Sequence, residues 1–152
     1  MSDTVEGAEP PFTFAMQTRV RWSEVDPQGV VFNPNYLVYA DIALTEYMRA
    51  IGLPFPDALE GSGNEIFAVR SEVDFRSPAR FDDVLTLSAR TARIGRTSFA
   101  VAFAIRREEA LLAEVRTIYV HADPKTATSL PLPERLIERI TAFERTAPER
   151  AA

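Results

Sequence analysis

The stretch from residue 26 to residue 36 holds the residue types whose spacing suits chemistry on a carbonyl group. Asp26 is followed by a Pro and then by Gly29. This pattern predicts a tight turn, because Pro fixes its own φ and Gly tolerates positive φ. Asn33 and Pro34 then precede a long apolar run, and we expect them to be the N-cap and the first residue of a helix.

A carboxylate placed just before the positive end of a helix suits acyl-transfer chemistry. Free amides and the helix dipole at such an end stabilise a developing negative oxygen. A nearby carboxylate can act as a general base or as a nucleophile. The same residues are also ordinary turn and cap signals, so the spacing alone leaves a purely structural role for Asp26 open.

One very apolar helix is expected to position this turn. Residues 12–22 alternate between apolar and polar, which predicts a half-buried strand. Residues 35–51 then place apolar side chains around most of a helix that Gly52 and Pro54 end. Such a helix must be enclosed by other elements rather than covered on one side.

Four further strands and a second helix are predicted downstream. Each strand is expected to carry one large apolar face, and the short connections imply antiparallel neighbours. These strands are expected near residues 67–75, 85–90, 99–105 and 110–122. The fold class is therefore α+β, with an antiparallel sheet of about five strands wrapped around the long helix. Residues 134–146 form an amphipathic helix that covers an edge or a face.

Length and composition exclude several classes of protein. A chain of 152 residues makes one domain, and its net charge of −5 argues against sequence-independent binding to nucleic acid. The absence of Cys excludes disulfides, iron–sulfur clusters and thiolate chemistry. The single histidine, His121, lies in no motif, and we expect a structural or exposed role for it.

The two ends of the chain are expected to lie outside the folded domain. Residues 1–11 are acidic and end in two prolines, which predicts a disordered arm and no signal peptide. Residues 12–146 form the domain, and 147–152 a C-terminal tail. No apolar run approaches the roughly 18 residues of a spanning helix, so no membrane span is expected and a cytoplasmic location is the default.

The motif from Trp22 to Tyr36 resembles that of a known enzyme family. It is similar to the 4-hydroxybenzoyl-CoA thioesterase-like branch of the hotdog-fold acyl-CoA thioesterases. The likeness covers residues 12–122 and continues through Val69-Arg70, Ser77 to Leu85 and Ile94 to Phe99. The resemblance implies the hotdog fold and hydrolysis of acyl-CoA to free acid and CoA, without cofactor or metal. The alternative is a hotdog module that binds acyl-CoA without catalysis.

The resemblance also implies roles for particular residues. Asp26 becomes the base or nucleophile, and the backbone N–H of Asn33 polarises the thioester carbonyl. Many relatives carry His where this chain has Asn33, which cannot titrate and is an amide donor, a cap, or both. Substrate contacts are expected near the motif and at the turn around Gly95, which the resemblance places at the nucleotide end of CoA. They comprise Gly29, Val31, Tyr36, Arg96, Thr97 and Ser98.

Several alternatives stay open at this point. Asp41 is a second candidate carboxylate, although a place on a solvated or intersubunit stripe with Thr45 and Arg49 is favoured. Additional cations for the CoA phosphates are Arg93 and, as weaker candidates, Arg70 and Arg80. The resemblance implies a site between the subunits of a homodimer or homotetramer. An aromatic or an aliphatic acyl group, and CoA or acyl-carrier protein as the carrier, fit equally.

Overall fold

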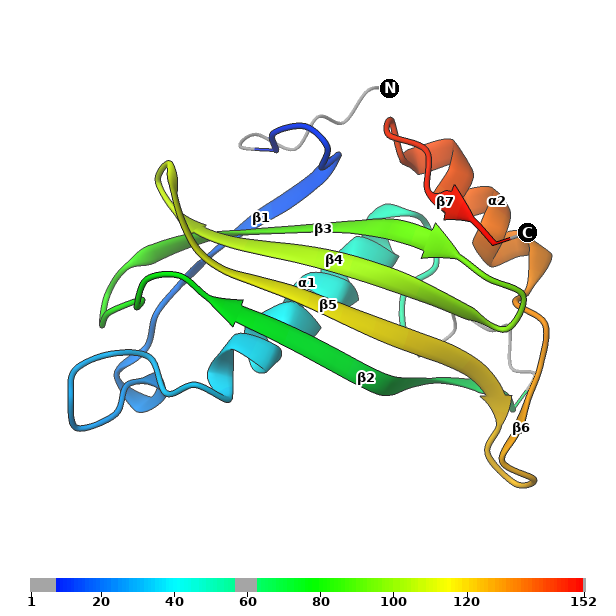
Figure 1. The fold of residues 1–152 in the computed structure, drawn as a ribbon, viewed down its shortest axis with the longest axis horizontal. Coiled ribbons are helices and arrows are strands. Elements are labelled where there is room, and N and C mark those ends of the chain that lie inside the picture. The colour runs from blue at the N-terminus through cyan, green and yellow to red at the C-terminus, as the bar shows by residue number, and fades with distance from the viewer. Residues whose placement is uncertain (1–7, 57–62, 152) are drawn as a thin grey trace.

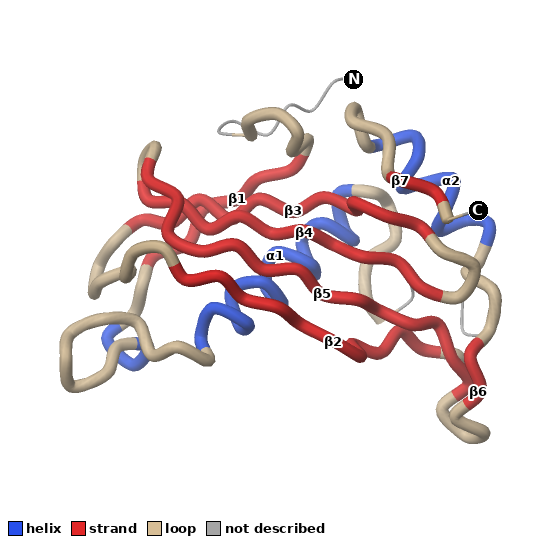
Figure 2. Tube along the Cα trace, in the orientation of Figure 1, coloured by secondary structure: helices blue, strands red, loops and turns tan. Residues whose placement is uncertain are grey.

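The computed structural model describes residues 8–56 and 63–151, and it shows one antiparallel sheet curled around a central helix (Figure 1). The helix α1 spans Asn35–Ala50. The five long strands lie in the order β1 (Phe14–Arg19), β3 (Val84–Ile94), β4 (Ser98–Arg107), β5 (Ala110–Asp123) and β2 (Glu65–Phe75). The α+β hotdog architecture is thereby confirmed, and Figure 2 shows the helix on one side of the sheet.

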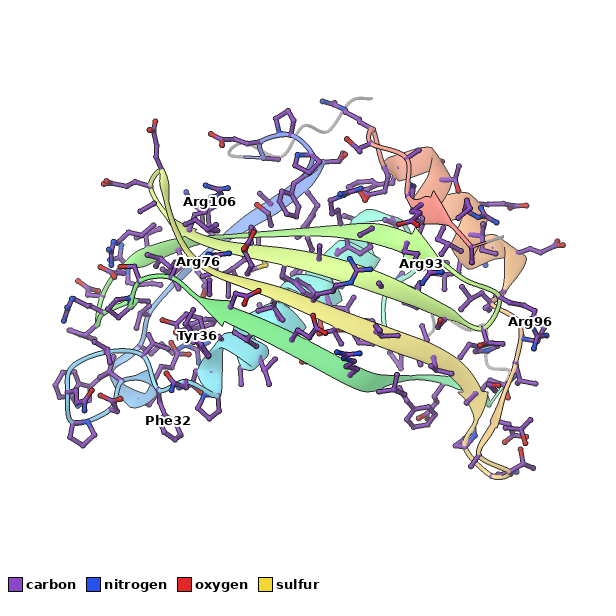
Figure 3. All side chains as sticks on the ribbon, in the orientation of Figure 1. Phe32, Tyr36, Arg76, Arg93, Arg96 and Arg106 are labelled. Carbon is purple, nitrogen blue, oxygen red and sulfur yellow. The ribbon has the colours of Figure 1, made fainter. Side chains whose placement is uncertain are left out.

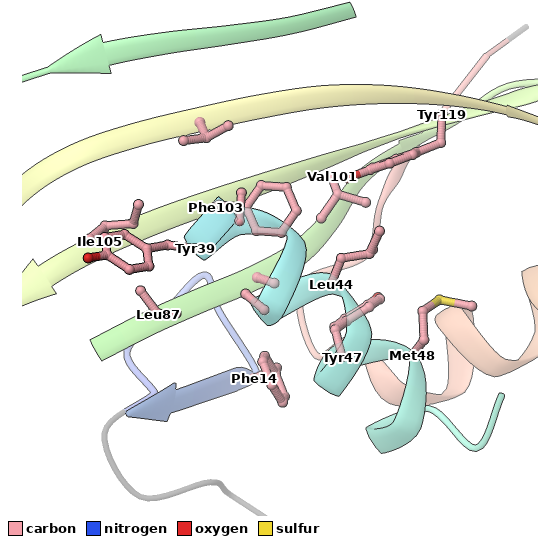
Figure 4. Packing of buried hydrophobic residues seen from close by; sticks show 14 of the residues in the cluster. Phe14, Tyr39, Leu44, Tyr47, Met48, Leu87, Val101, Phe103, Ile105 and Tyr119 are labelled. Atoms are coloured by element: carbon pink, nitrogen blue, oxygen red, sulfur yellow. The ribbon is translucent and has the colours of Figure 1, made fainter. Parts of the chain in front are cut away.

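The core lies between α1 and the concave face of the sheet. On β4, Phe99, Val101 and Phe103 are buried and alternate with alanines that face the other way. Figure 4 shows the β4 side chains facing Tyr39 and Leu44 of α1. The helix buries seven of its residues, namely Tyr36, Tyr39, Ala40, Ala43, Leu44, Tyr47 and Met48. The expectation that the sheet wraps this apolar helix is confirmed, but Leu37 and Val38 stay exposed, so the helix is not enclosed on all sides.

The expectation of a single apolar face was wrong for β2. The register with β5 shifts between Ala68 and Arg70, where β2 bulges. Phe67 pairs with Val120, whereas Val73 pairs with Val115. Since Val115 and Val120 are five positions apart on β5, their side chains lie on opposite faces of the sheet, and so do those of Phe67 and Val73. The extra residue of the bulge thus reverses the alternation halfway along the strand.

The start of α1 also differs from the prediction. Pro34 is the N-cap and Asn35 is the first helical residue, and no side chain caps this end. Asn33 is therefore not the N-cap, because the first helical amides bond to backbone carbonyls instead of to its side chain. At the other end, the helix stops at Ala50, and Gly52 follows with a φ of 86°. That left-handed conformation favours glycine, as expected.

The C-terminal region packs against the far end of the sheet. The amphipathic helix α2 (Glu134–Phe143) ends three residues earlier than predicted and buries Leu136 and Ile140. The segment predicted as a tail contains β7 (Glu149–Arg150), which pairs in parallel with β3. The other short elements are β6 (Thr128–Ser129), which pairs with β5, and the 3-10 helix η1 (Trp22–Glu24).

The described ranges leave out most of the predicted N-terminal arm. Residues 1–7 of that arm lie outside them, as do residues 57–62 between α1 and β2. In the part of the chain that is described, no helix has both the length and the apolar character needed to cross a membrane.

Candidate active site

The start of α1 leaves one amide available. Asn35 N–H donates to the Phe32 carbonyl at 2.9 Å, and Tyr36 N–H donates to the Asn33 carbonyl at 3.3 Å. The Leu37 N–H donates to the Pro34 carbonyl at 3.1 Å, and Pro34 itself has no N–H. Within residues 8–56 and 63–151, the Asn33 N–H has no acceptor. An unpaired donor therefore stands at the positive end of the helix dipole.

The predicted turn at Asp26 is present. The Gly29 N–H donates to the Asp26 carbonyl at 2.9 Å, and the Asp26 N–H donates to the Val30 carbonyl at 2.8 Å. Gly29 has a φ of 78°, which a residue with a Cβ rarely adopts. The side chain of Asp26 accepts a hydrogen bond from the Gln28 N–H at 2.8 Å through Oδ1. No donor in the described ranges contacts Oδ2, so this oxygen can accept a further hydrogen bond.

A cavity of about 300 Å³ adjoins both features. Its wall contains Val31, Asn33 and Tyr36, three of the predicted site residues. Tyr36 packs edge-on against Phe75 at 5.3 Å, and its hydroxyl accepts a hydrogen bond from the Ala79 N–H at 3.0 Å. The full lining is Val30, Val31, Asn33, Tyr36, Phe75, Arg76, Ser77 and Pro78. Asp26 and Gly29 are not part of this wall and lie on the turn that leads into Val30.

Arg76 is a member of this wall that the sequence did not single out. It follows directly after β2, and its guanidinium pairs with Glu114 at 2.8 Å. It follows a strand whose alternation is interrupted by the bulge, so periodicity gave no indication of where its side chain lies. A cation thus lies on the same cavity as the Asn33 amide.

A second group of cations surrounds the β3–β4 turn. Arg93, Arg96 and Arg116 line a cavity of about 250 Å³ together with Gly95 and Ser98. The structure therefore brings the predicted Arg93, Arg96 and Ser98 together. Arg116 joins them from β5, and the sequence pattern did not predict this, because it depends on the register of β5 against β4.

Thr97 has a different position at this turn. It is not in the wall of the cavity, and its carbonyl accepts a hydrogen bond from the His121 N–H at 2.9 Å. The His121 side chain is buried and its Nδ1 lies 2.9 Å from the Pro131 carbonyl oxygen. This confirms the structural role expected for His121.

The two cavities lie at opposite ends of the sheet. Figure 3 shows Phe32 and Tyr36 at one end and Arg93 and Arg96 at the other. The strand β3, which connects the two ends, has 11 residues and is therefore about 36 Å long. A single protomer does not bring the two predicted halves of the site together.

The remaining candidates take no part in either cavity. Asp41 is exposed on α1, where its carbonyl accepts a hydrogen bond from the Thr45 hydroxyl at 3.0 Å. It thus lies on the polar stripe that was expected. Arg70 pairs with Glu72 on β2, and the Arg80 N–H donates to Asp83 at 2.8 Å.

Comparison with known proteins identifies the family. Residues 28–114 match the model of the thioesterase superfamily, and the chain belongs to this superfamily. Its fold and its enzyme class are therefore those that the resemblance implied. Asp26 lies just before the matched residues, so the family match by itself does not include the predicted carboxylate.

Individual relatives support the same assignment. The chain is 26% identical to the 1,4-dihydroxy-2-naphthoyl-CoA hydrolase of Synechococcus elongatus, over 81% of this chain and 91% of the relative. It is 28% identical to the acyl-CoA thioester hydrolase YbgC of Escherichia coli, over 82% of this chain and 92% of the relative. A thioesterase from Thermus thermophilus, solved with coenzyme A and Zn, superposes with a TM-score of 0.77 at 29% identity and covers 90% of this chain and 97% of its own.

Proposed function

We propose that this protein hydrolyses acyl-CoA thioesters to a free acid and CoA, with Asp26 and the Asn33 backbone amide as its catalytic groups. The observation that carries the proposal is the unpaired Asn33 N–H in a cavity wall at the positive end of α1. Asp26 lies on the adjoining turn, with one carboxylate oxygen free of donors in the described ranges. Membership of the thioesterase superfamily supports this choice of reaction.

The Asn33 amide acts on the carbonyl oxygen of the thioester. When the carbonyl carbon is attacked, negative charge develops on that oxygen, and the N–H and the helix dipole stabilise it. Removing one such donor typically costs about 3 kcal/mol of activation free energy. Asn33 serves through its backbone, so the histidine that many relatives carry at this position is not required.

Asp26 supplies the attack by one of two routes. In the first, its carboxylate adds to the carbonyl carbon and expels the CoA thiolate, and water then hydrolyses the mixed anhydride. In the second, it takes a proton from a water molecule that attacks the carbonyl carbon directly, and the thiolate leaves with a proton. Both routes consume one water and give one acid and one thiol.

The second half of the site comes from another subunit in this proposal. Arg93, Arg96 and Arg116 offer three guanidinium groups, which suit the phosphates of CoA. Arg93 and Arg96 lie at the opposite end of the sheet from Phe32, the residue before Asn33 (Figure 3). A homodimer or homotetramer can place the β3–β4 turn of one subunit beside the Asp26 turn of its partner, which explains why one protomer separates them.

Release of free thiol from a panel of aromatic and aliphatic acyl-CoAs tests the proposal. Asp26→Asn retains the acceptor for the Gln28 N–H, so the turn is preserved while the carboxylate is lost. We expect kcat/KM to fall by at least about a hundredfold. The matched control is Asp123→Asn, because Asp123 Oδ1 accepts a hydrogen bond from the Lys125 N–H at 2.8 Å in the same kind of turn.

Two outcomes of this assay contradict the proposal. Equal thiol release by the wild type and Asp26→Asn removes Asp26 from the reaction. Saturable binding of acyl-CoA without any thiol release by the wild type supports the alternative of a non-catalytic binding module. An acyl-carrier protein thioester in the same panel identifies the thiol carrier.

A further inference from the structure

Glu24 joins the two segments that carry the proposed catalytic groups. Its carboxylate Oε1 accepts hydrogen bonds from the Arg21 N–H at 2.8 Å and from the Tyr39 hydroxyl at 3.0 Å. Its backbone carbonyl accepts from the Phe32 N–H and from the Asn35 side-chain amide, both at 2.9 Å. One residue thus connects η1, the segment before α1, and the first two turns of α1.

These contacts lie next to both catalytic groups along the chain. Glu24 stands two residues before Asp26, Phe32 is bonded directly to Asn33, and Asn35 stands two residues after Asn33. Between Glu24 and Phe32 the chain makes the Asp26 turn, whose backbone also pairs with itself through Asp26 and Val30. The bonds at Glu24 therefore close the loop that contains Asp26 and connect its two ends to the start of α1.

One partner of Glu24, Tyr39, is firmly held in the core. The side chain of Tyr39 is 1% exposed, and its ring packs edge-on against Tyr36 at 6.1 Å. Burial and then the charge of Glu24 raise the pKa of Tyr39 above its ordinary value. The phenol therefore stays protonated at neutral pH and donates to the carboxylate.

We propose that Glu24, Asn35 and Tyr39 are positioning residues that set the distance between the Asp26 carboxylate and the Asn33 amide. This inference rests on the proposed function and extends it to side chains that contact neither the thioester nor CoA. A displacement of about 1 Å between reacting groups costs about a hundredfold in rate. Bonds from a rigid buried helix to the loop keep that displacement small.

A matched pair of tyrosine variants tests the inference. Tyr39→Phe removes the hydroxyl that contacts Glu24 and keeps the ring. Tyr47→Phe is the control, since Tyr47 lies two turns later on α1, is also fully buried, and has its hydroxyl 2.9 Å from that of Thr91. Each variant loses one buried hydroxyl from the same helix, but only the first loses a bond to the loop.

We expect Tyr39→Phe to lower kcat by about tenfold and to leave KM within about twofold, because the loss concerns the transition state. Hydrogen exchange of the amides in residues 24–35 should increase in the same variant. Tyr47→Phe should lose stability without either effect. A second pair of variants separates the charge of Glu24 from its role as a hydrogen-bond acceptor. Glu24→Ala should lower kcat as Tyr39→Phe does. Glu24→Gln keeps an acceptor for both donors and should retain most of the wild-type kcat.

The outcomes distinguish this inference from the function on which it rests. If the wild type releases no thiol, the proposed function is overturned and the catalytic role of Glu24 with it. If the wild type is active but Tyr39→Phe and Tyr47→Phe have equal kcat, or Glu24→Gln is as slow as Glu24→Ala, only the positioning role is overturned.

Discussion

The carboxyl group of Glu144 lies buried where α2 meets β3, and it makes the stability of the fold depend on pH. Its side chain accepts a hydrogen bond from the Thr91 N–H at 3.1 Å through Oε2. Its Oε1 is buried and has no partner in the described ranges. Burial raises the pKa of Glu144 to about 7, although the Arg90 guanidinium and the Thr91 bond oppose the rise. Burial and then the charge of Glu144 raise the pKa of the Tyr47 phenol.

The direction of the effect follows from which state holds the proton. The carboxyl has an ordinary pKa of 4.5 and a pKa of about 7 in the fold. Between these values the folded chain binds a proton that the unfolded chain has lost, so the free energy of unfolding falls as pH rises. Above both pKa values the carboxyl is ionised in the folded and the unfolded chain, so its titration no longer changes the free energy of unfolding. The difference corresponds to at most about 3 kcal/mol.

Glu144→Gln removes this titration and keeps an acceptor for the Thr91 N–H. Urea unfolding of both proteins at pH 5 and pH 8 measures the effect. We expect the wild type to lose up to about 3 kcal/mol more than the variant between the two pH values. Glu138→Gln on the exposed side of α2 is the control and should behave as the wild type. If the free energy of unfolding changes equally in the wild type and Glu144→Gln between pH 5 and pH 8, ionisation of Glu144 does not destabilise the fold, and the prediction is contradicted.

Two further variants probe the loop and the cations. Gly29→Ala should cost about 1 kcal/mol of stability, because its φ of 78° strains a residue with a Cβ although no atom lies within 4 Å. The same variant should also lower kcat. Thermal unfolding measures the stability and the thiol assay measures kcat; an unchanged melting temperature together with an unchanged kcat would contradict the prediction. Arg116→Gln should raise KM for acyl-CoA by about tenfold and leave kcat unchanged, as expected for loss of a phosphate contact of about 1.5 kcal/mol. An unchanged KM would remove Arg116 from the proposed CoA site.

The sequence predicted an element correctly where its apolar residues kept one spacing, helical or alternating, over the whole length of the element. The alternation of Phe99, Val101 and Phe103 with alanines identified β4, and the apolar surface of residues 35–51 identified the central helix. The strand β2 was found, but the bulge after Ala68 reversed its faces. A bulge is a local backbone choice that the side-chain pattern alone does not specify.

The site was predictable where local turn chemistry determined it. The Asp26 turn followed from its Pro and Gly, whereas the expected cap at Asn33 was wrong because backbone carbonyls satisfy the first helical amides. Arg76 and Arg116 were missed, since each reaches its cavity through the register of neighbouring strands. Only long-range pairing brings such residues together, and a single sequence carries little information on it.

The proposed catalytic groups are the unpaired Asn33 amide and the Asp26 carboxylate on the preceding turn. A crystal structure of the oligomer with a non-hydrolysable acyl-CoA analogue tests this assignment most directly. We predict that the carbonyl oxygen of the analogue lies about 3 Å from the Asn33 nitrogen, with the Asp26 carboxylate facing the carbonyl carbon directly or through one water. A carbonyl bound elsewhere, with Asn33 N–H left to solvent, would contradict it.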